Sequence, residues 1–149
     1  MKYFILNIFL FFTSCLSAYT QILKPVTWSY SSKRISSTEA IIYIKANLQE
    51  GWHLYSQTVG EGGPVATSFH FVSAASYELL GRAVEPKPVK KFEPVFMMEV
   101  SYFENSAIFQ QKVKLKSKKP IVRGKVKFMV CNDKQCLPPG EIEFVISVK

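Results

Sequence analysis

Two cysteines near the end of the chain, Cys131 and Cys136, are separated by four residues and followed by Leu137 and two prolines. Thiols at this spacing on a strand end can form and break a disulfide without unfolding the rest of the chain. A disulfide needs Cα atoms about 5.5 Å apart, which a tight connection between two strands readily provides. The pair therefore predicts thiol–disulfide exchange as the first hypothesis and a static structural disulfide as the second.

The structural alternative has less physical support than exchange. Closing so short a loop stabilises a fold by only about 2 kcal/mol, and a chain with many apolar strand residues has little need of it. A disulfide across a short polar loop is also accessible and easily reduced. Binding of Cu(I) is a third alternative, because Met97, Met98 and Met129 offer soft sulfur ligands. Met97 and Met98 are predicted on opposite faces of a strand, so we expect no metal site and no cofactor.

Other kinds of catalytic site find little support in the sequence. No Ser–His–Asp or Cys–His motif is recognisable, and His53 and His70 have no metal-ligand spacing. The cysteines do not form a Cys-x-x-Cys motif at a helix start within a βαβ unit. Without a helix dipole to activate a thiolate, the pair suits direct exchange with a protein partner. We expect an electron carrier of the thiol–disulfide oxidoreductase type rather than an enzyme that acts alone on small molecules.

Residues 1–20 show the order of features found in a secretory signal peptide. Lys2 gives a positive start, residues 4–12 are apolar apart from Asn7, and small or polar residues follow. The apolar stretch is far shorter than the ~20 residues that span a bilayer. We predict cleavage near residue 20 and export, to the periplasm or an equivalent compartment, of a soluble domain at residues 21–149 with no membrane span. Lipidation at Cys15 is a minor alternative.

Export allows disulfides, whereas the same cysteines in the cytosol would point toward metal. The formal net charge is +8 at pH 7. Lys112, Lys114 and Lys116 alternate with Val113 and Leu115, which places the lysines on one face of a strand. We interpret them as a solvated face that discourages pairing at a sheet edge. Export argues against nucleic acid as a partner, while an acidic protein surface remains open.

The mature chain is predicted to be all-β and to form one domain. Removing the signal peptide leaves about 130 residues, enough for one hydrophobic core. Short segments of alternating apolar and polar residues are separated by Gly, Pro, Asn and Ser, which is typical of strands. Seven to nine such segments indicate an antiparallel β-sandwich. The clearest runs are residues 40–48, 107–115, 122–130 and 142–148.

Two segments interrupt the strand pattern. Residues 60–64 are rich in glycine, but a strand-like segment follows them, whereas a phosphate cradle needs a helix N-terminus. We predict a mobile loop there. Residues 85–94 contain three prolines and are predicted to cross between the sheets as a stiff, irregular segment.

With these features in place, the chain resembles a known family, the N-terminal periplasmic domain of the thiol:disulfide interchange protein DsbD. The resemblance extends over nearly the whole mature chain and is most specific at residues 131–139, with support from residues 51–55 and 93–96. It implies an immunoglobulin-like fold. It also implies that the cysteine pair accepts electrons from a thioredoxin-like domain and passes them to exported thioredoxin-fold proteins, such as disulfide isomerases and cytochrome c maturation factors.

The resemblance further implies a cap loop, in which an acidic residue and an aromatic cover the cysteines until a partner docks. Glu93 matches the acidic position. Val95 falls where the family's aromatic is expected, so Phe96 or Phe92 would cover the cysteines instead.

The resemblance also assigns the cysteines and the active-site strand. The second cysteine of the family meets the partner, so Cys136 is expected to react first and Cys131 to resolve. In the active-site strand Tyr55 is retained, whereas His53 stands in place of a tyrosine. The best-known members place one more residue between their cysteines.

The sequence ends at Lys149, after the last predicted strand, without a membrane relay or a thioredoxin domain. We therefore expect the electron donor to be a separate membrane-bound or thioredoxin-like protein. The alternative function is a non-catalytic binding module that keeps the sandwich and uses the disulfide as a brace.

Overall fold

The computed structural model describes residues 23–149, which form eleven β-strands and no helix. The predicted signal peptide, its cleavage site and Cys15 lie outside the described residues. Within residues 23–149, no helix is long and apolar enough to cross a membrane. The strands are β1 (Val26–Arg34), β2 (Glu39–Leu48), β3 (His53–Tyr55), β4 (Ser68–Phe71), β5 (Tyr77–Val84), β6 (Val89–Glu93), β7 (Met98–Glu104), β8 (Ser106–Leu115), β9 (Ile121–Phe128), β10 (Val130–Cys131) and β11 (Gly140–Ser147).

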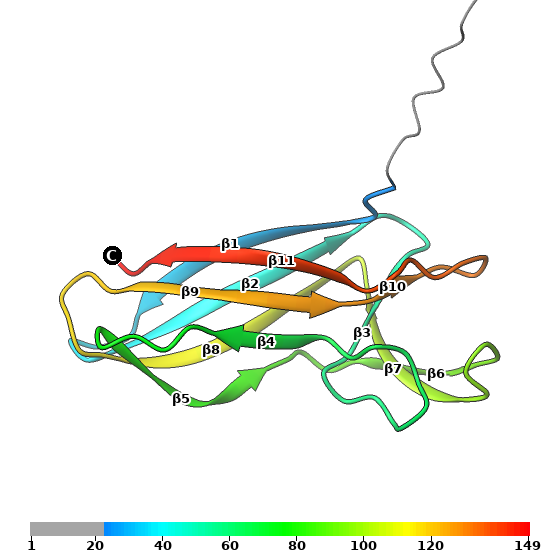
Figure 1. The fold of residues 1–149 in the computed structure, drawn as a ribbon, viewed down its shortest axis with the longest axis horizontal. Helices are drawn as coiled ribbons and strands as arrows, with labels where there is room; N and C mark the ends of the chain where they lie inside the picture. The colour runs from blue at the N-terminus through cyan, green and yellow to red at the C-terminus, as the bar shows by residue number, and fades with distance from the viewer. Residues whose placement is uncertain (1–22) are drawn as a thin grey trace, which may run out of the picture.

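The strands pair antiparallel in three sheets, with the orders β1-β2-β8-β5, β11-β9-β4 and β10-β3-β7-β6. Figure 1 shows β11, β9 and β4 lying over β1, β2 and β8, with the strands of the third sheet gathered at one end of the molecule. We call this third sheet the end sheet. The two facing layers confirm the predicted all-β, immunoglobulin-like antiparallel sandwich.

The main core lies between the two long layers. Phe109 of β8 is fully buried, and its ring contacts Phe69 of β4 and Phe103 of β7 at centroid distances of 4.9 and 5.6 Å. Burying each such side chain contributes roughly 1.5–3 kcal/mol, so the long strands supply most of the stability. The other large side chains of this core include Ile42, Ile44, Val113, Val122, Val126, Phe144 and Ile146.

The lysine face of β8 is solvated, as predicted. Burial alternates along the whole strand, and Lys112 and Lys114 are exposed. However, β8 pairs with β2 on one side and β5 on the other. The lysines therefore do not protect a sheet edge, and that part of the interpretation is wrong. Lys112 instead forms an ion pair with Glu39 of the neighbouring strand, with an N–O distance of 2.8 Å.

Two long segments change sheet at the same end of the sandwich. Between β7 and β8, Asn105 adopts a φ of 59°, and its carbonyl accepts a hydrogen bond from the Leu48 amide at 2.8 Å. This turn carries the chain from the end sheet into β8. Between β9 and β10, Met129 interrupts the strand, and β10 joins β3 in the end sheet. The second change carries Cys131 away from the long sheets and beside β3.

The structure has more strands than the seven to nine predicted, and the reason is local. With three and two residues, β3 and β10 are too short to show an alternating pattern. The continuous strand predicted through Val130 is broken at Met129. The segment 85–94 was predicted to be irregular, yet it contains β6, which pairs with β7 through its whole length. Prolines flank β6 and its residues are mostly polar, which is typical of an edge strand.

Candidate functional site

Cys131 and Cys136 form a disulfide, as the sequence predicts, and their Cα atoms lie 4.0 Å apart. Cys131 ends β10, and Cys136 faces it in an isolated antiparallel bridge. The four residues between them form a tight turn. The Asn132 side-chain oxygen accepts hydrogen bonds from the amides of Lys134 and Gln135, at 2.9 and 2.8 Å. Because these hydrogen bonds hold the turn, the loop can keep its shape when the disulfide is opened.

The two cysteines differ in their access to solvent. Cys131 is buried, with 1% of its surface exposed, whereas Cys136 is half-buried. After Cys136 the chain returns toward β10, where the Leu137 amide donates a hydrogen bond to the Val130 carbonyl at 3.0 Å. A protein that approaches the end sheet therefore reaches Cys136 before Cys131.

Cys131 belongs to a small group of buried residues separate from the main core. We call it the end-sheet cluster: Tyr55, Val100, Tyr102 and Cys131. Half-buried side chains pack against it, namely Val59, Phe96, Met98, Met129 and Cys136. No sequence pattern marks Val59 as a neighbour of the cysteines, and Met129 was considered only as a metal ligand. Met129 lies two residues before Cys131, and this spacing is the signal that could have suggested a shared face.

Strand β3 lies between the cysteines and β7. Its residue His53 pairs with Cys131 on one side and with Glu104 on the other. The His53 Nε2 atom lies 3.2 Å from the Tyr55 hydroxyl, within hydrogen-bond distance. The imidazole also packs against the rings of Tyr55 and Tyr102, at centroid distances of 5.2 and 4.8 Å. Both residues predicted for the active-site strand therefore lie on the face of the sheet that carries Cys131.

Burial and nearby charges set the protonation of this face. Burial lowers the pKa of His53; the charge of Glu93 opposes this effect and that of Lys91 reinforces it. Burial also raises the pKa of the Tyr55 hydroxyl well above its usual range, with the charge of Glu93 as a second cause. For Tyr102, burial and then the charge of Glu104 raise the pKa. Near neutral pH the face therefore presents a neutral imidazole and two neutral phenols.

The turn between β6 and β7 covers one side of the end-sheet cluster. It contains Pro94, Val95, Phe96 and Met97. The Phe96 ring meets the Tyr55 ring edge to face, at a centroid distance of 6.1 Å and an angle of 90°. The Phe96 amide donates to the Glu93 carbonyl at 3.1 Å, which closes the turn. Of the predicted cap residues, Phe96 thus lies against the cluster that holds Cys131.

Of the other predicted cap residues, Glu93 lies on the cluster's side of β6, whereas Val95 and Phe92 do not face the cluster. Glu93 is half-buried, pairs with Met98, and exerts its charge on His53. Val95 points outward, with 73% of its surface exposed. Phe92 is 55% exposed and pairs with Glu99, one register position away from Glu93. Because successive strand residues alternate between faces, Phe92 lies on the side of β6 opposite the end-sheet cluster.

The glycine-rich loop covers the cluster from another side. A Cβ atom on Gly60 would lie 2.6 Å from the Met98 Cε atom, and one on Gly63 would lie 2.9 Å from the Met98 Sδ atom. The Val65 amide approaches the Met129 sulfur at 3.4 Å. The glycines thus allow the loop backbone to pack closely on Met98, a role that composition alone does not reveal.

The base of this loop is fixed by hydrogen bonds. The Thr67 hydroxyl donates to the Tyr55 carbonyl at 2.6 Å, and the Thr67 amide donates to the Ser56 carbonyl at 3.1 Å. The Glu85 carboxylate accepts from the Ser56 hydroxyl at 2.6 Å and from the Gln57 amide at 2.8 Å. Glu85 begins the segment that leads to β6, so the bases of both covering loops are connected.

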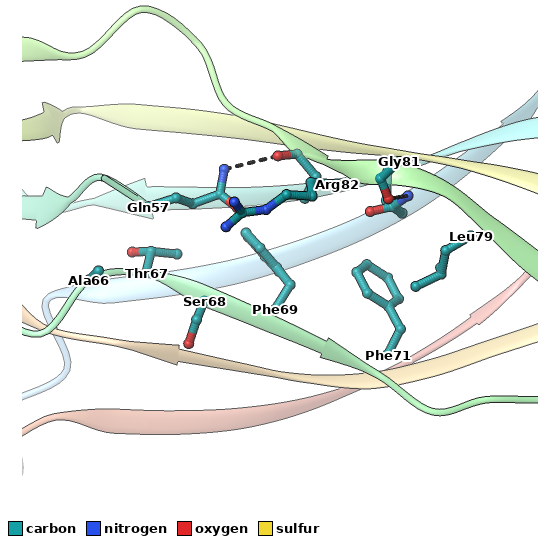
Figure 2. Close-up of a pocket in the computed structure, with 11 residues that line it drawn as sticks. Gln57, Ala66, Thr67, Ser68, Phe69, Phe71, Leu79, Gly81 and Arg82 are labelled. Atoms are coloured by element: carbon teal, nitrogen blue, oxygen red, sulfur yellow. Dashed lines mark hydrogen bonds between the residues drawn. The ribbon is translucent and has the colours of Figure 1, made fainter. Parts of the chain in front are cut away.

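A cavity of about 270 Å³ lies between β4 and β5, and it holds none of the predicted site residues. Figure 2 shows Phe71 and Leu79 facing each other across it. The amide of Gln111, a buried polar side chain, donates to the Gly81 carbonyl at 3.2 Å. With no thiol, imidazole or carboxylate in its lining, this cavity offers no redox chemistry.

Two sets of side chains bear on the alternative of a metal site. Within residues 23–149, no group of three or more His, Cys, Asp or Glu side chains could hold a metal ion. The soft-ligand alternative relied on three methionines. Met97 lies in the turn rather than in a strand, with a φ of 53° and 76% of its surface exposed. Met98 and Met129 pack against the end-sheet cluster.

Comparison with known proteins yields one family. The family model described as "Thiol:disulfide interchange protein DsbD, N-terminal" matches residues 20–147. This range takes in both cysteines, the active-site strand and both covering loops. No curated protein matches the chain.

Three solved structures show the likeness in fold. The N-terminal periplasmic domain of ScsB from Proteus mirabilis has a TM-score of 0.60 and 16% identity, over 85% of this chain and 47% of that chain. The reduced DsbD N-terminal domain of Neisseria meningitidis has a TM-score of 0.52 and 14% identity, over 80% and 84%. The DsbD–PilB N-terminal domain complex of the same organism gives 0.54 and 12%, over 84% and 87%. At such identities these structures show a shared fold, and the chain spans about half of the ScsB structure.

Proposed function

The chain belongs to the family of DsbD N-terminal domains, and from this premise we propose that it is an exported thiol–disulfide relay domain. The observation that carries the proposal is the asymmetric disulfide at the end sheet, with Cys131 buried and Cys136 within reach of a partner. A structural brace gains nothing from such an arrangement. An exchange reaction needs one accessible sulfur for attack and one protected sulfur for resolution.

The reaction moves two electrons from the reduced domain to a protein acceptor. The Cys136 thiolate attacks one sulfur of the acceptor disulfide, which forms a mixed disulfide and releases the acceptor's other sulfur as a thiolate. The Cys131 thiolate then attacks Cys136 Sγ, so that the Cys131–Cys136 bond forms and the bond to the acceptor breaks. The acceptor leaves as a dithiol. A separate membrane-bound or thioredoxin-like donor reduces the domain again by the reverse steps.

Thioredoxin-fold exported proteins are the proposed acceptors. The related Neisseria DsbD domain forms a complex with the N-terminal domain of PilB, which supports a protein rather than a small molecule as the partner. We assign the cap to Phe96 and Glu93, since the Phe96 ring lies against Tyr55 in the cluster that contains Cys131. A docking partner displaces this turn and gains access to Cys136.

Trapping of the mixed disulfide tests the proposal. In Cys131→Ala the resolving thiol is absent, so the variant should accumulate an adduct through Cys136. The partner is a purified exported thioredoxin-fold protein in which the second active-site cysteine is replaced by alanine and the first is converted to a mixed disulfide with 2-nitro-5-thiobenzoate. Attack by Cys136 forms the protein–protein disulfide and releases the coloured thiolate. The adduct is read on a non-reducing gel and by mass spectrometry.

The matched control is Cys136→Ala, which keeps only the buried thiol and should form little adduct. Circular dichroism establishes that both variants remain folded. A folded Cys131→Ala domain that forms no adduct with any of several thioredoxin-fold partners contradicts the relay function.

A further inference from the structure

His53 lies directly opposite the buried cysteine. In the end sheet, Cys131 of β10, His53 of β3 and Glu104 of β7 occupy one row across three strands. Directly paired residues of antiparallel strands point to the same face, with Cβ atoms about 4.5–5.5 Å apart. The main-core residues Leu54 and Val130 occupy the other face. The imidazole is therefore the side chain of β3 directly paired with Cys131, and Tyr55 lies two residues along the same face.

The ring of His53 is held in place. Only 8% of its surface is exposed, and the rings of Tyr55 and Tyr102 pack against it at 5.2 and 4.8 Å. Its Nε2 atom is engaged with the Tyr55 hydroxyl at 3.2 Å. Either atom can donate in this hydrogen bond, and in the tautomer that directs the Nε2 proton to Tyr55 the lone pair of the neutral ring lies on Nδ1, where it can accept a proton.

Charged groups face this ring from every neighbouring element. Tyr102 and Glu104 come from β7, Lys91 and Glu93 from β6, and Asp133 from the cysteine loop. Burial outweighs these charges and lowers the pKa of His53, so the ring is neutral near pH 7 and can accept a proton. The Cys131 thiol has the opposite need, because burial among apolar side chains disfavours its thiolate.

We propose that His53 is the proton acceptor for Cys131 in the resolving step. This inference rests on the proposed relay function. The Cys131 S–H proton passes to the imidazole, and the electron pair on sulfur attacks Cys136 Sγ of the mixed disulfide. The bond between Cys136 and the partner breaks, and the partner thiolate leaves. The imidazolium then returns its proton to that thiolate or to water.

The test uses the aromatic disulfide 5,5′-dithiobis(2-nitrobenzoate) and the reduced wild-type domain. Attack by Cys136 releases one coloured thiolate, and resolution by Cys131 releases the second, so stopped-flow absorbance separates the two steps. His53→Gln should slow the second release at pH 7 by about a hundredfold or more, in line with general base catalysis. The first release should keep its wild-type rate.

The pH profile separates a proton acceptor from a structural residue. At high pH, once the solution itself ionises the Cys131 thiol, the base is no longer needed, so the variant should approach the wild-type rate. His53→Tyr is the matched control, because it keeps an aromatic ring between Tyr55 and Tyr102 but has no base near neutral pH. It should be as slow as His53→Gln. A second release at the wild-type rate in both variants, or one slowed equally at every pH, overturns the proposal.

The wild-type profile keeps the proposal testable if neither variant folds. The second release should then reach half its plateau below pH 6.5, where His53 titrates. A rate that instead rises tenfold per pH unit up to about pH 8.5 shows that the thiol ionises without a base, and this result overturns the proposal. The reagent needs no protein partner. A failed partner trap with a base-assisted second release therefore contradicts only the relay function.

Discussion

The two long sheets, which we call the sandwich body, contain longer strand ladders than the end sheet. In the body, β2 pairs with β1 and β8 over nine positions on each side. In the end sheet, β10 pairs with β3 at two positions, and β3 pairs with β7 at three. Regions with few ladder hydrogen bonds open more readily than long ladders. The Cys131–Cys136 disulfide thus lies where local rearrangement disturbs the fold least.

The two faces of the end sheet also differ in how they are packed. Leu54, Phe103 and Val130 point into the main core. Tyr55 and Cys131 point to the other face, against which the turn 94–97 and the glycine-rich loop pack. A partner can therefore displace the covering loops while the core side of the same strands stays packed.

The largest expected effect compares the unfolding free energy contributed by the core of the sandwich body with that contributed by the disulfide. Phe109→Ala removes a fully buried ring that contacts Phe69 and Phe103, and it should destabilise the domain by about 3–5 kcal/mol. The double variant Cys131→Ser with Cys136→Ser should cost about 2 kcal/mol, the value for closing so short a loop. Urea unfolding of both proteins, against the wild type, measures the two losses.

A disulfide that stabilises the domain as much as Phe109 does would instead favour the structural brace. The reduction potential gives an independent reading. A relay should equilibrate with glutathione buffers between about −270 and −120 mV, whereas a structural disulfide lies below about −300 mV.

The second effect concerns the two faces of β6. Phe96→Ala removes the ring that packs on Tyr55. A loss of about 1 kcal/mol in packing raises the population of the open state roughly fivefold, so iodoacetamide should alkylate reduced Cys136 roughly five times faster. Phe92→Ala is the matched control, because it removes the same ring from the opposite face of β6 and should leave the rate unchanged.

Equal alkylation rates in the two phenylalanine variants and the wild type would show that the turn does not gate the cysteines. The glycine-rich loop would then be the remaining cover, since it packs on Met98. Gly60→Ala tests that alternative, because the added Cβ atom must displace the loop or the methionine.

The sequence predicts the body well because its strands are long. In β8, ten residues alternate without interruption, and the buried positions follow directly. The end sheet is harder to predict, because β3 and β10 are too short to carry a pattern and their pairing joins distant parts of the chain. The row of Cys131, His53 and Glu104 depends on the change of sheet at Met129, which no local signal marks.

The sequence does not reveal which side of the end sheet each cap residue faces, for a similar reason. Alternation along β6 separates Phe92 from Glu93, but it cannot be continued through the turn to Phe96. At Met97 the backbone enters the left-handed region, with a φ of 53°, which reverses the chain. The packing of Gly60 on Met98 is equally invisible in composition, which predicts only a mobile loop.

The smallest expected effect is the response of the end sheet to acid. Burial lowers the pKa of His53 in the folded domain below its usual value of 6.5, and Glu93, Glu104 and Asp133 only partly offset this. Below about pH 6.5 the unfolded chain therefore binds the proton more tightly than the folded one, and stability falls until the pH passes the folded pKa. Each pKa unit of difference is worth about 1.4 kcal/mol at most.

His53→Gln has no such group, so its stability relative to the wild type should improve between pH 7.5 and pH 5. Urea midpoints of both proteins at each pH measure the change. A constant difference across this range would mean that His53 titrates alike in the folded and unfolded chains, and the neutral, desolvated imidazole beside Cys131 would lose its support.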